Sequence, residues 1–202
     1  MRKLLITFIL LLPLANLYAQ DLSIEMRGTT TWEQTNFQIS ITQKGTSVTI
    51  KYRLKVDADR EALRKDSAAK ALPAKYKNAR TDPKEEQKLV LEFAKISERY
   101  RKSYQDSLTV DIEQQPKYKK LLTYITNTNQ AMFHGGVNLT SDQDELYCTI
   151  TYNNKVMTFE KNAPLAVTSP LLYALIRETL RLGEEAGTKS ALKIDEVFKY
   201  LI

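Results

Sequence analysis

The feature that most constrains the fold is a stretch of strict alternation, SVTIKYRLKV, at residues 47–56. Every second side chain in this stretch is apolar, and the side chains between them are polar or charged. A period of two places these two sets on opposite faces of a β-strand. The stretch therefore predicts a sheet with one buried face and one solvent-facing side, which is typical of antiparallel sheets. The apolar set is Val48, Ile50, Tyr52, Leu54 and Val56.

Three other segments show the same alternation, and they divide the chain into two β regions. LSIEMR at 22–27 and NFQISITQ at 36–43 precede the first stretch, with a turn expected at Lys44-Gly45. ELYCTITYNNKVMTFEKN at 145–162 forms the second region. Its Asn153-Asn154 pair predicts a tight hairpin turn, because asparagine tolerates a positive φ.

Between the two β regions, the spacing of apolar residues predicts helices. The segment DPKEEQKLVLEFAKISERYRKSY at 82–104 begins with Asp82-Pro83, which is typical of a helix start. Its apolar side chains recur at steps of three and four residues, which places them on one stripe of a helix. PKYKKLLTYI at 116–125 predicts a second, shorter helix. The stripe of the first helix is Leu89, Phe93, Ile96, Tyr100 and Tyr104.

Two more helices are predicted after the second β region. SPLLYALIRETLRLG at 169–183 has Ser169 as its cap and Gly183 just past its end. IDEVFKYLI at 194–202 also has helical spacing. This order predicts an α+β fold: an antiparallel sheet of about five strands, with helices from the middle and the C-terminus packed on one face. We expect residues 20–202 to form a single domain with a basic helical middle at 58–126.

The N-terminal segment, MRKLLITFILLLPLANLYAQ, has the layout of a secretory signal peptide. Arg2 and Lys3 precede an apolar run at residues 4–12, and Ala19 precedes the expected cleavage site. The run is too short to span a bilayer, which takes about 20 residues, although an uncleaved membrane anchor is the alternative. We expect residues 1–19 to be removed, and the mature protein to be periplasmic or secreted without a transmembrane segment.

Positive charge is concentrated in the middle of the chain. Residues 58–120 contain 16 Lys plus Arg and 11 Asp plus Glu, a net charge of +5, whereas the rest of the mature chain has 12 and 13. This excess fits either a solvated helical face or a surface for an acidic protein partner or an anionic envelope. Nucleic acid is not expected, because acidic residues are interleaved and an exported protein seldom meets it. The candidate binding residues are Arg99, Arg101, Lys102, Lys117, Lys119 and Lys120.

The catalytic inventory is sparse, and we expect no cofactor and no metal. The sequence lacks G-x-S-x-G, a P-loop and G-x-G-x-x-G, and one cysteine with one histidine is too few for the usual zinc sites. Cys148 falls on the apolar face of a predicted strand and is interpreted as a buried packing residue. His134 in FHGGVN at 133–138 has no orienting partner in view, so this segment predicts a turn rather than a general base.

Function is predicted mainly from export, size and the missing catalytic set. The leading hypothesis is an exported bacterial, non-catalytic interaction protein, and one specific version is a periplasmic immunity-type protein that blocks a delivered toxin. Two alternatives stay open: a periplasmic hydrolase that acts through carboxylates, and an envelope component or carrier of a small apolar ligand. The carboxylates for a hydrolase would be Asp142, Asp144 and Glu145, which otherwise form a polar loop that enters a strand.

Overall fold

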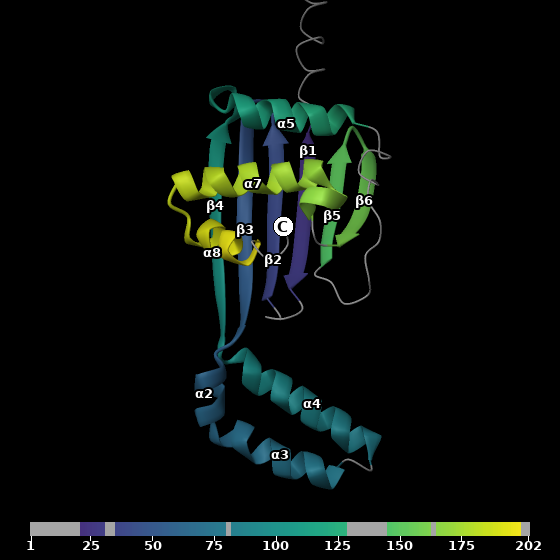
Figure 1. Cartoon of the computed structure of the whole chain (residues 1–202), viewed down its shortest axis with the longest axis vertical. Coiled ribbons are helices and arrows are strands. Elements are labelled where there is room, and N and C mark those ends of the chain that lie inside the picture. Colours follow the sequence, from purple (N-terminus) through teal and green to yellow (C-terminus); the bar gives the residue numbers. More distant parts are fainter. Residues whose placement is uncertain (1–20, 31–34, 80–81, 129–144, 163–164, 199–202) are drawn as a thin grey trace, which may run out of the picture.

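Six strands form one antiparallel sheet in the order β4-β3-β2-β1-β5-β6 (Figure 1). The computed structural model describes residues 21–30, 35–79, 82–128, 145–162 and 165–198. The α+β class and the antiparallel sheet predicted from the sequence are confirmed, with one strand more than expected. The strands are β1 Leu22–Thr30, β2 Thr35–Lys44, β3 Ser47–Ala58, β4 Arg101–Asp111, β5 Glu145–Tyr152 and β6 Lys155–Asn162.

The alternation in β3 produces the predicted two-faced strand. Ile50 and Tyr52 are fully buried, whereas Lys51 and Arg53 between them are exposed. At the edge of the sheet opposite β4, β5 and β6 are joined by the predicted two-residue turn, in which Asn153 and Asn154 have φ angles of 50° and 59°. Local sequence patterns therefore account for both the buried face and the hairpin.

Three helices cover one face of the sheet in Figure 1: α5 Pro116–Asn127, α7 Pro170–Glu185 and α8 Lys189–Phe198. The short α6, Leu165–Thr168, precedes α7. A buried hydrogen-bonded group joins these layers, because the Tyr52 hydroxyl donates to the Thr179 carbonyl at 2.6 Å. The hydroxyls of Tyr118 and Thr179 lie 3.1 Å apart. The sequence pattern predicts Gly183 just past the end of α7, but in the structure Gly183 lies inside this helix.

The sixth strand, β4, corrects the predicted helix at 82–104. The helix α4, Pro83–Glu98, ends before Tyr100, and Tyr104 lies on β4 instead of on a helical stripe. The residues of β4 also alternate, and pairing with β3 places Tyr104 opposite Leu54 and Leu108 opposite Ile50. The edge of the long β3 needs a hydrogen-bonded partner, and this tertiary demand overrides the local helical spacing. The predicted helical middle at 58–126 therefore contains a strand.

Three helices of the middle segment project beyond the end of the sheet (Figure 1). They are α2 Arg60–Lys65, α3 Ser67–Ala79 and α4, and they connect the end of β3 to the start of β4. We call residues 59–100 the helical arm. The prediction that the middle helices pack on the sheet is thus correct for α5 and wrong for the arm. No helix in the described ranges is long and apolar enough to cross a membrane.

The lone cysteine lies in the core, as predicted. Cys148 is 1% exposed and pairs with Met26 of β1 and Phe159 of β6. Burial raises the pKa of its thiol to about 12, so the reactive thiolate is scarce at neutral pH. We expect iodoacetamide to modify Cys148 only after denaturation, and Cys148→Ala to lower the free energy of unfolding by about 1 kcal/mol. Rapid alkylation of the folded protein would contradict this assignment.

Candidate functional site

The helical arm is closed at its base by a backbone hydrogen bond between its first and last residues, Asp59 and Tyr100. The Asp59 carboxylate caps α2 by accepting from the backbone N–H groups of Glu61 and Ala62, both at 3.0 Å. These bonds, that from Ala62 foremost, lower the pKa of Asp59. The backbone N–H of Asp59 donates to the Tyr100 carbonyl at 3.1 Å. The chain therefore leaves β3 and returns to β4 through one hydrogen-bonded neck.

A second set of contacts braces this neck. The Asp66 carboxylate, between α2 and α3, accepts from the Tyr100 hydroxyl at 2.6 Å and from the backbone N–H of Ala69 at 2.9 Å. The bond from Tyr100 is the main reason that the pKa of Asp66 is lowered, and the same bond raises the pKa of Tyr100. Lys55 of β3 forms an ion pair with Glu98 of α4 at 2.6 Å. These contacts hold the arm to the end of the sheet.

The arm leaves much of its apolar surface uncovered. Among the described side chains of α3 and α4, the buried ones are Leu72, Ile96 and Ser97. Large apolar side chains stay in contact with solvent, and contiguous surface of this kind marks interaction sites on soluble proteins. The exposed fractions are 41% for Tyr76, 55% for Val90, 56% for Leu91 and 47% for Phe93.

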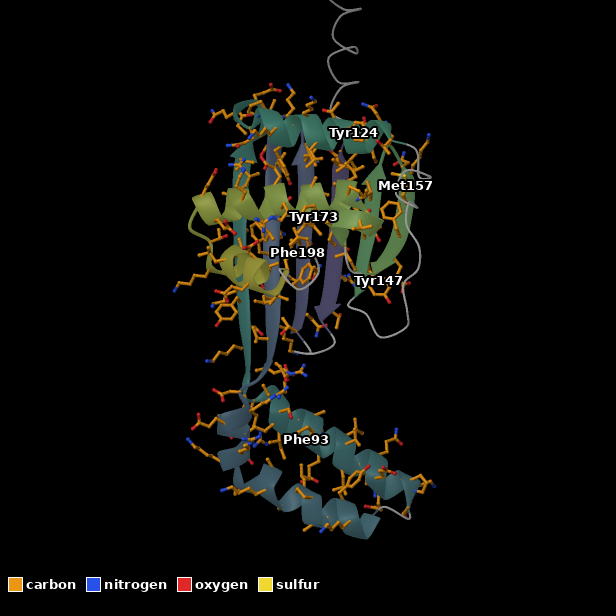
Figure 2. The ribbon with its side chains drawn as sticks, viewed as in Figure 1. Phe93, Tyr124, Tyr147, Met157, Tyr173 and Phe198 are labelled. Carbon is orange, nitrogen blue, oxygen red and sulfur yellow. The ribbon has the colours of Figure 1, made fainter. Side chains whose placement is uncertain are left out.

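Three of these side chains, Tyr76, Val90 and Phe93, border a groove between α3 and α4, which we call the arm groove. Figure 2 labels Phe93 in this region. Its outer part has a volume of about 310 Å³ and an almost entirely apolar lining. Its inner part, at the root of the arm, is about 730 Å³. The two parts share Ala69, Pro73, Val90 and Phe93, so they form one continuous groove. The outer part adds Leu72, Tyr76 and Leu89.

The root of the groove is positively charged. Among the described residues, four cationic side chains line it, and Asp57 is the single acidic one. Within the described part of the chain, Arg64 and Lys70 have no ion-pair partner. Arg60 and Arg101 have only long ion pairs, at 4.0 Å to Asp57 and at 3.7 Å to Glu98. The cations are Arg60, Arg64, Lys70 and Arg101.

Two buried donors at this root have no hydrogen-bond partner within the described ranges. Ser97 is 8% exposed, and its Oγ has no partner among the described residues. The Nε of Arg101 is also buried without a partner there. A buried polar group without a hydrogen bond costs about 1–3 kcal/mol. An acceptor that reached these donors would recover part of that cost.

The helical arm and the first two residues of β4 together account for the whole positive excess of the middle segment. Residues 59–102 contain 13 Lys plus Arg and 8 Asp plus Glu, a net charge of +5. Residues 103–120 contain three of each, a net charge of zero. The charge asymmetry predicted from the sequence therefore falls on the arm and on the start of β4 at its base.

The structure separates the six predicted binding residues into two distant clusters. Arg99 is exposed directly after α4, Arg101 lines the groove, and Lys102 is exposed on β4. The three lysines lie on α5, which Figure 1 shows at the opposite end of the sheet. The 11 residues of β4 between them span about 35 Å. These lysines are Lys117, Lys119 and Lys120.

Several sequence candidates fall outside the described residues. They include His134 with its neighbouring glycines, and the carboxylates Asp142 and Asp144. Glu145 begins β5. Within the described ranges, no group of three or more His, Cys, Asp and Glu side chains could hold a metal ion.

The groove also contains residues that the sequence patterns did not indicate, among them Arg64, Lys70 and Pro73. The available signal was the apolar stripe of Leu89, Phe93 and Ile96, which the spacing assigned to packing on the sheet. The spacing of residues along α4 does not reveal that this stripe faces α3 and that the arm groove lies between the two helices.

In class, the chain is an α+β protein in which a helical arm joins two neighbouring strands of an antiparallel sheet. Comparison with known proteins finds no matching family model, no similar curated protein and no similar solved structure. The chemistry of the arm groove is an apolar floor with cations and unused donors at one end. Such a site suits an anionic segment that also carries apolar side chains.

Proposed function

We propose that this chain is an exported bacterial, non-catalytic binding protein whose helical arm binds an acidic protein partner. The observation that carries the proposal is the open arm groove, with an apolar floor and poorly paired cations at its root. Export rests on the signal-peptide pattern at residues 1–19. A specific version is an immunity-type protein, whose arm covers an acidic surface of a delivered toxin.

The residue types in the groove support protein binding. Protein interfaces are enriched in aromatic residues and arginine, and these types dominate the energetically important positions. The arm offers Tyr76 and Phe93 beside Arg60, Arg64 and Arg101. The net charge of +5 would attract an acidic partner and accelerate its association.

The proposal predicts a rate effect that depends on which end of the molecule is changed. A pull-down from the native periplasm should yield a stoichiometric protein partner. With that partner, the triple substitution Arg99→Glu, Arg101→Glu and Lys102→Glu should lower the association rate constant about tenfold or more, because it reverses the field at the arm. The effect should fade as salt rises, since the Debye length falls below about 8 Å. Stopped-flow kinetics at several salt concentrations measures the association rate constant and its dependence on salt.

The matched control places the same charge change on α5. Lys117→Glu, Lys119→Glu and Lys120→Glu should leave the association rate nearly unchanged, because these residues lie a sheet length away from the arm. Circular dichroism of both variants checks that they fold. Equal rates for the two triple variants would reject the arm as the binding surface. Turnover of cell-wall or glycan substrates without a stoichiometric partner would instead support the carboxylate hydrolase.

A further inference from the structure

We propose that the arm groove receives an acidic amphipathic helix of the protein partner, with a carboxylate of that helix bound by Arg101 and Ser97 at the root. This inference rests on the proposed function and adds the form of the bound segment and its anchor. It follows from the shape of the groove, from its unused donors and from the charge of the arm.

The groove is suited to a helix rather than to an extended peptide. Both of its walls are helices, whose backbone groups are hydrogen-bonded within α3 and α4 except at Pro73, which has no N–H to donate to the Ala69 carbonyl. An extended segment would find no row of backbone donors and acceptors there, whereas a helix satisfies its own. The 16 residues of α4 rise about 24 Å, which is enough for several turns of a bound helix.

The lining has the spacing that a bound helix requires. On α4, Val90, Phe93 and Ser97 follow one another at steps of three and four, so they lie along one side of the helix. On α3, Ala69, Pro73 and Tyr76 do the same. A partner helix with apolar side chains at steps of three and four would pack between these two rows.

The root provides the anchor for a carboxylate. The guanidinium of Arg101 has one ion pair among the described residues, at 3.7 Å to Glu98, which is too long for a hydrogen bond. A carboxylate at the root would accept from this guanidinium, and the hydroxyl of Ser97, which lines the same part of the groove, is the second donor that the proposal assigns to it. Arg64 and Lys70 on the rim would add unpaired positive charge.

Charge argues against the other apolar occupants. A second copy of the chain would bring another arm, with 11 Lys plus Arg and 8 Asp plus Glu and thus a net charge of +3, against the first, and like charges repel. The apolar segment at residues 4–12 is preceded by Arg2 and Lys3, so it is also positive. An acidic amphipathic helix from a different protein has an apolar face for the floor of the groove and negative charge for the cations at its root.

The test uses protein purified from the periplasm and synthetic peptides of about 14 residues, roughly 21 Å long as helices. One peptide carries Leu and Phe on one helical face and Glu on the other. The second has the same composition in scrambled order, and the third has Lys in place of Glu. At physiological salt, we expect the first to bind about tenfold or more tightly than the others and to gain helicity on binding.

Variants of the root test the anchor. Ser97→Ala and Arg101→Lys should each weaken binding of the acidic helical peptide about threefold or more, because the first removes a donor and the second removes the planar fork while keeping its charge. The matched control is Arg53→Lys, which makes the same change at an exposed position of β3 outside the groove lining. It should leave the affinity unchanged.

Three outcomes would overturn the inference. The first is that the acidic helical peptide does not bind, and the second is that the scrambled or the Lys peptide binds equally well. The third is that dodecanoate, a fatty acid tested in the same assay, binds at Arg101 in place of the peptide. If the peptides fail while reversal of the arm charges still slows the natural partner, only the helix inference is lost. If the peptides bind while that reversal has no effect, the groove takes a helix but the proposed function fails.

Discussion

Replacing Gly183 with alanine will lower the free energy of unfolding by about 1–3 kcal/mol, the range for overpacking a core. A Cβ at this position would collide with the Ala191 side chain of α8 and would lie 2.8 Å from the Tyr52 hydroxyl and 2.9 Å from Thr188 Oγ1. Helix propensity alone predicts a higher free energy of unfolding for the variant, because alanine is favoured over glycine by about 1 kcal/mol inside a helix. Urea denaturation, with comparison of the midpoint and the m-value, distinguishes the two expectations.

Two controls isolate the collision. Ala174 is exposed on the same helix, so Ala174→Gly should cost about 1 kcal/mol through propensity alone. The double variant Gly183→Ala with Ala191→Gly should be more stable than the sum of the single changes predicts, since it removes the nearest contact. A Gly183→Ala protein as stable as the parent would mean that α7 and α8 approach less closely than the structure indicates.

Replacing Phe93 with serine will weaken binding of the natural partner by about 30-fold or more, the loss expected at an interface hot spot. Phe93 lines both parts of the arm groove and is 47% exposed. Because nearly half of this residue is already exposed, the free energy of unfolding should fall by only about 1 kcal/mol, roughly half of the value for a fully buried phenylalanine. Isothermal titration with the captured partner measures the affinity, and urea denaturation measures the stability.

The matched control for Phe93 lies two residues away. Leu91 is on the same helix and is 56% exposed, but it does not line the groove. Leu91→Ser should therefore leave the affinity unchanged while removing a similar exposed apolar side chain. If both variants weaken binding equally, the partner recognises the arm without using the groove. If Phe93→Ser abolishes the helical signal of the arm, its effect on binding is structural.

Parts of the fold could be predicted because they depend on near neighbours in sequence. The alternation in β3 has one consistent arrangement, with Ile50 and Tyr52 inside and Lys51 outside. The Asn153-Asn154 hairpin depends on two residues that tolerate a positive φ. The missed strand β4 depends on a distant partner, because Tyr104 and Leu108 fit a helical or an extended spacing until β3 lies beside them.

The candidate site could be predicted only in part. Charge counts along the sequence identified the positive segment. The structure narrows this segment to the arm and the start of β4, and it separates Arg101 from Lys119 by the length of the sheet. The spacing identified Phe93 as apolar and helical but assigned it to packing on the sheet. Which surface an apolar stripe faces depends on how the elements are placed in space, and spacing along one helix carries no information about that.

By itself, the sequence determined the buried face of the sheet, the hairpin turn, the apolar character of Cys148 and the excess of positive charge. Each of these follows from side chains within a few residues of one another, so a local pattern is sufficient. Only the tertiary structure decided that residues 101–111 form a strand, that the arm projects from the sheet, and that Ser97 and Arg101 meet at the root of a groove. Those features depend on pairing and packing between distant segments, whose free energy outweighs local propensity.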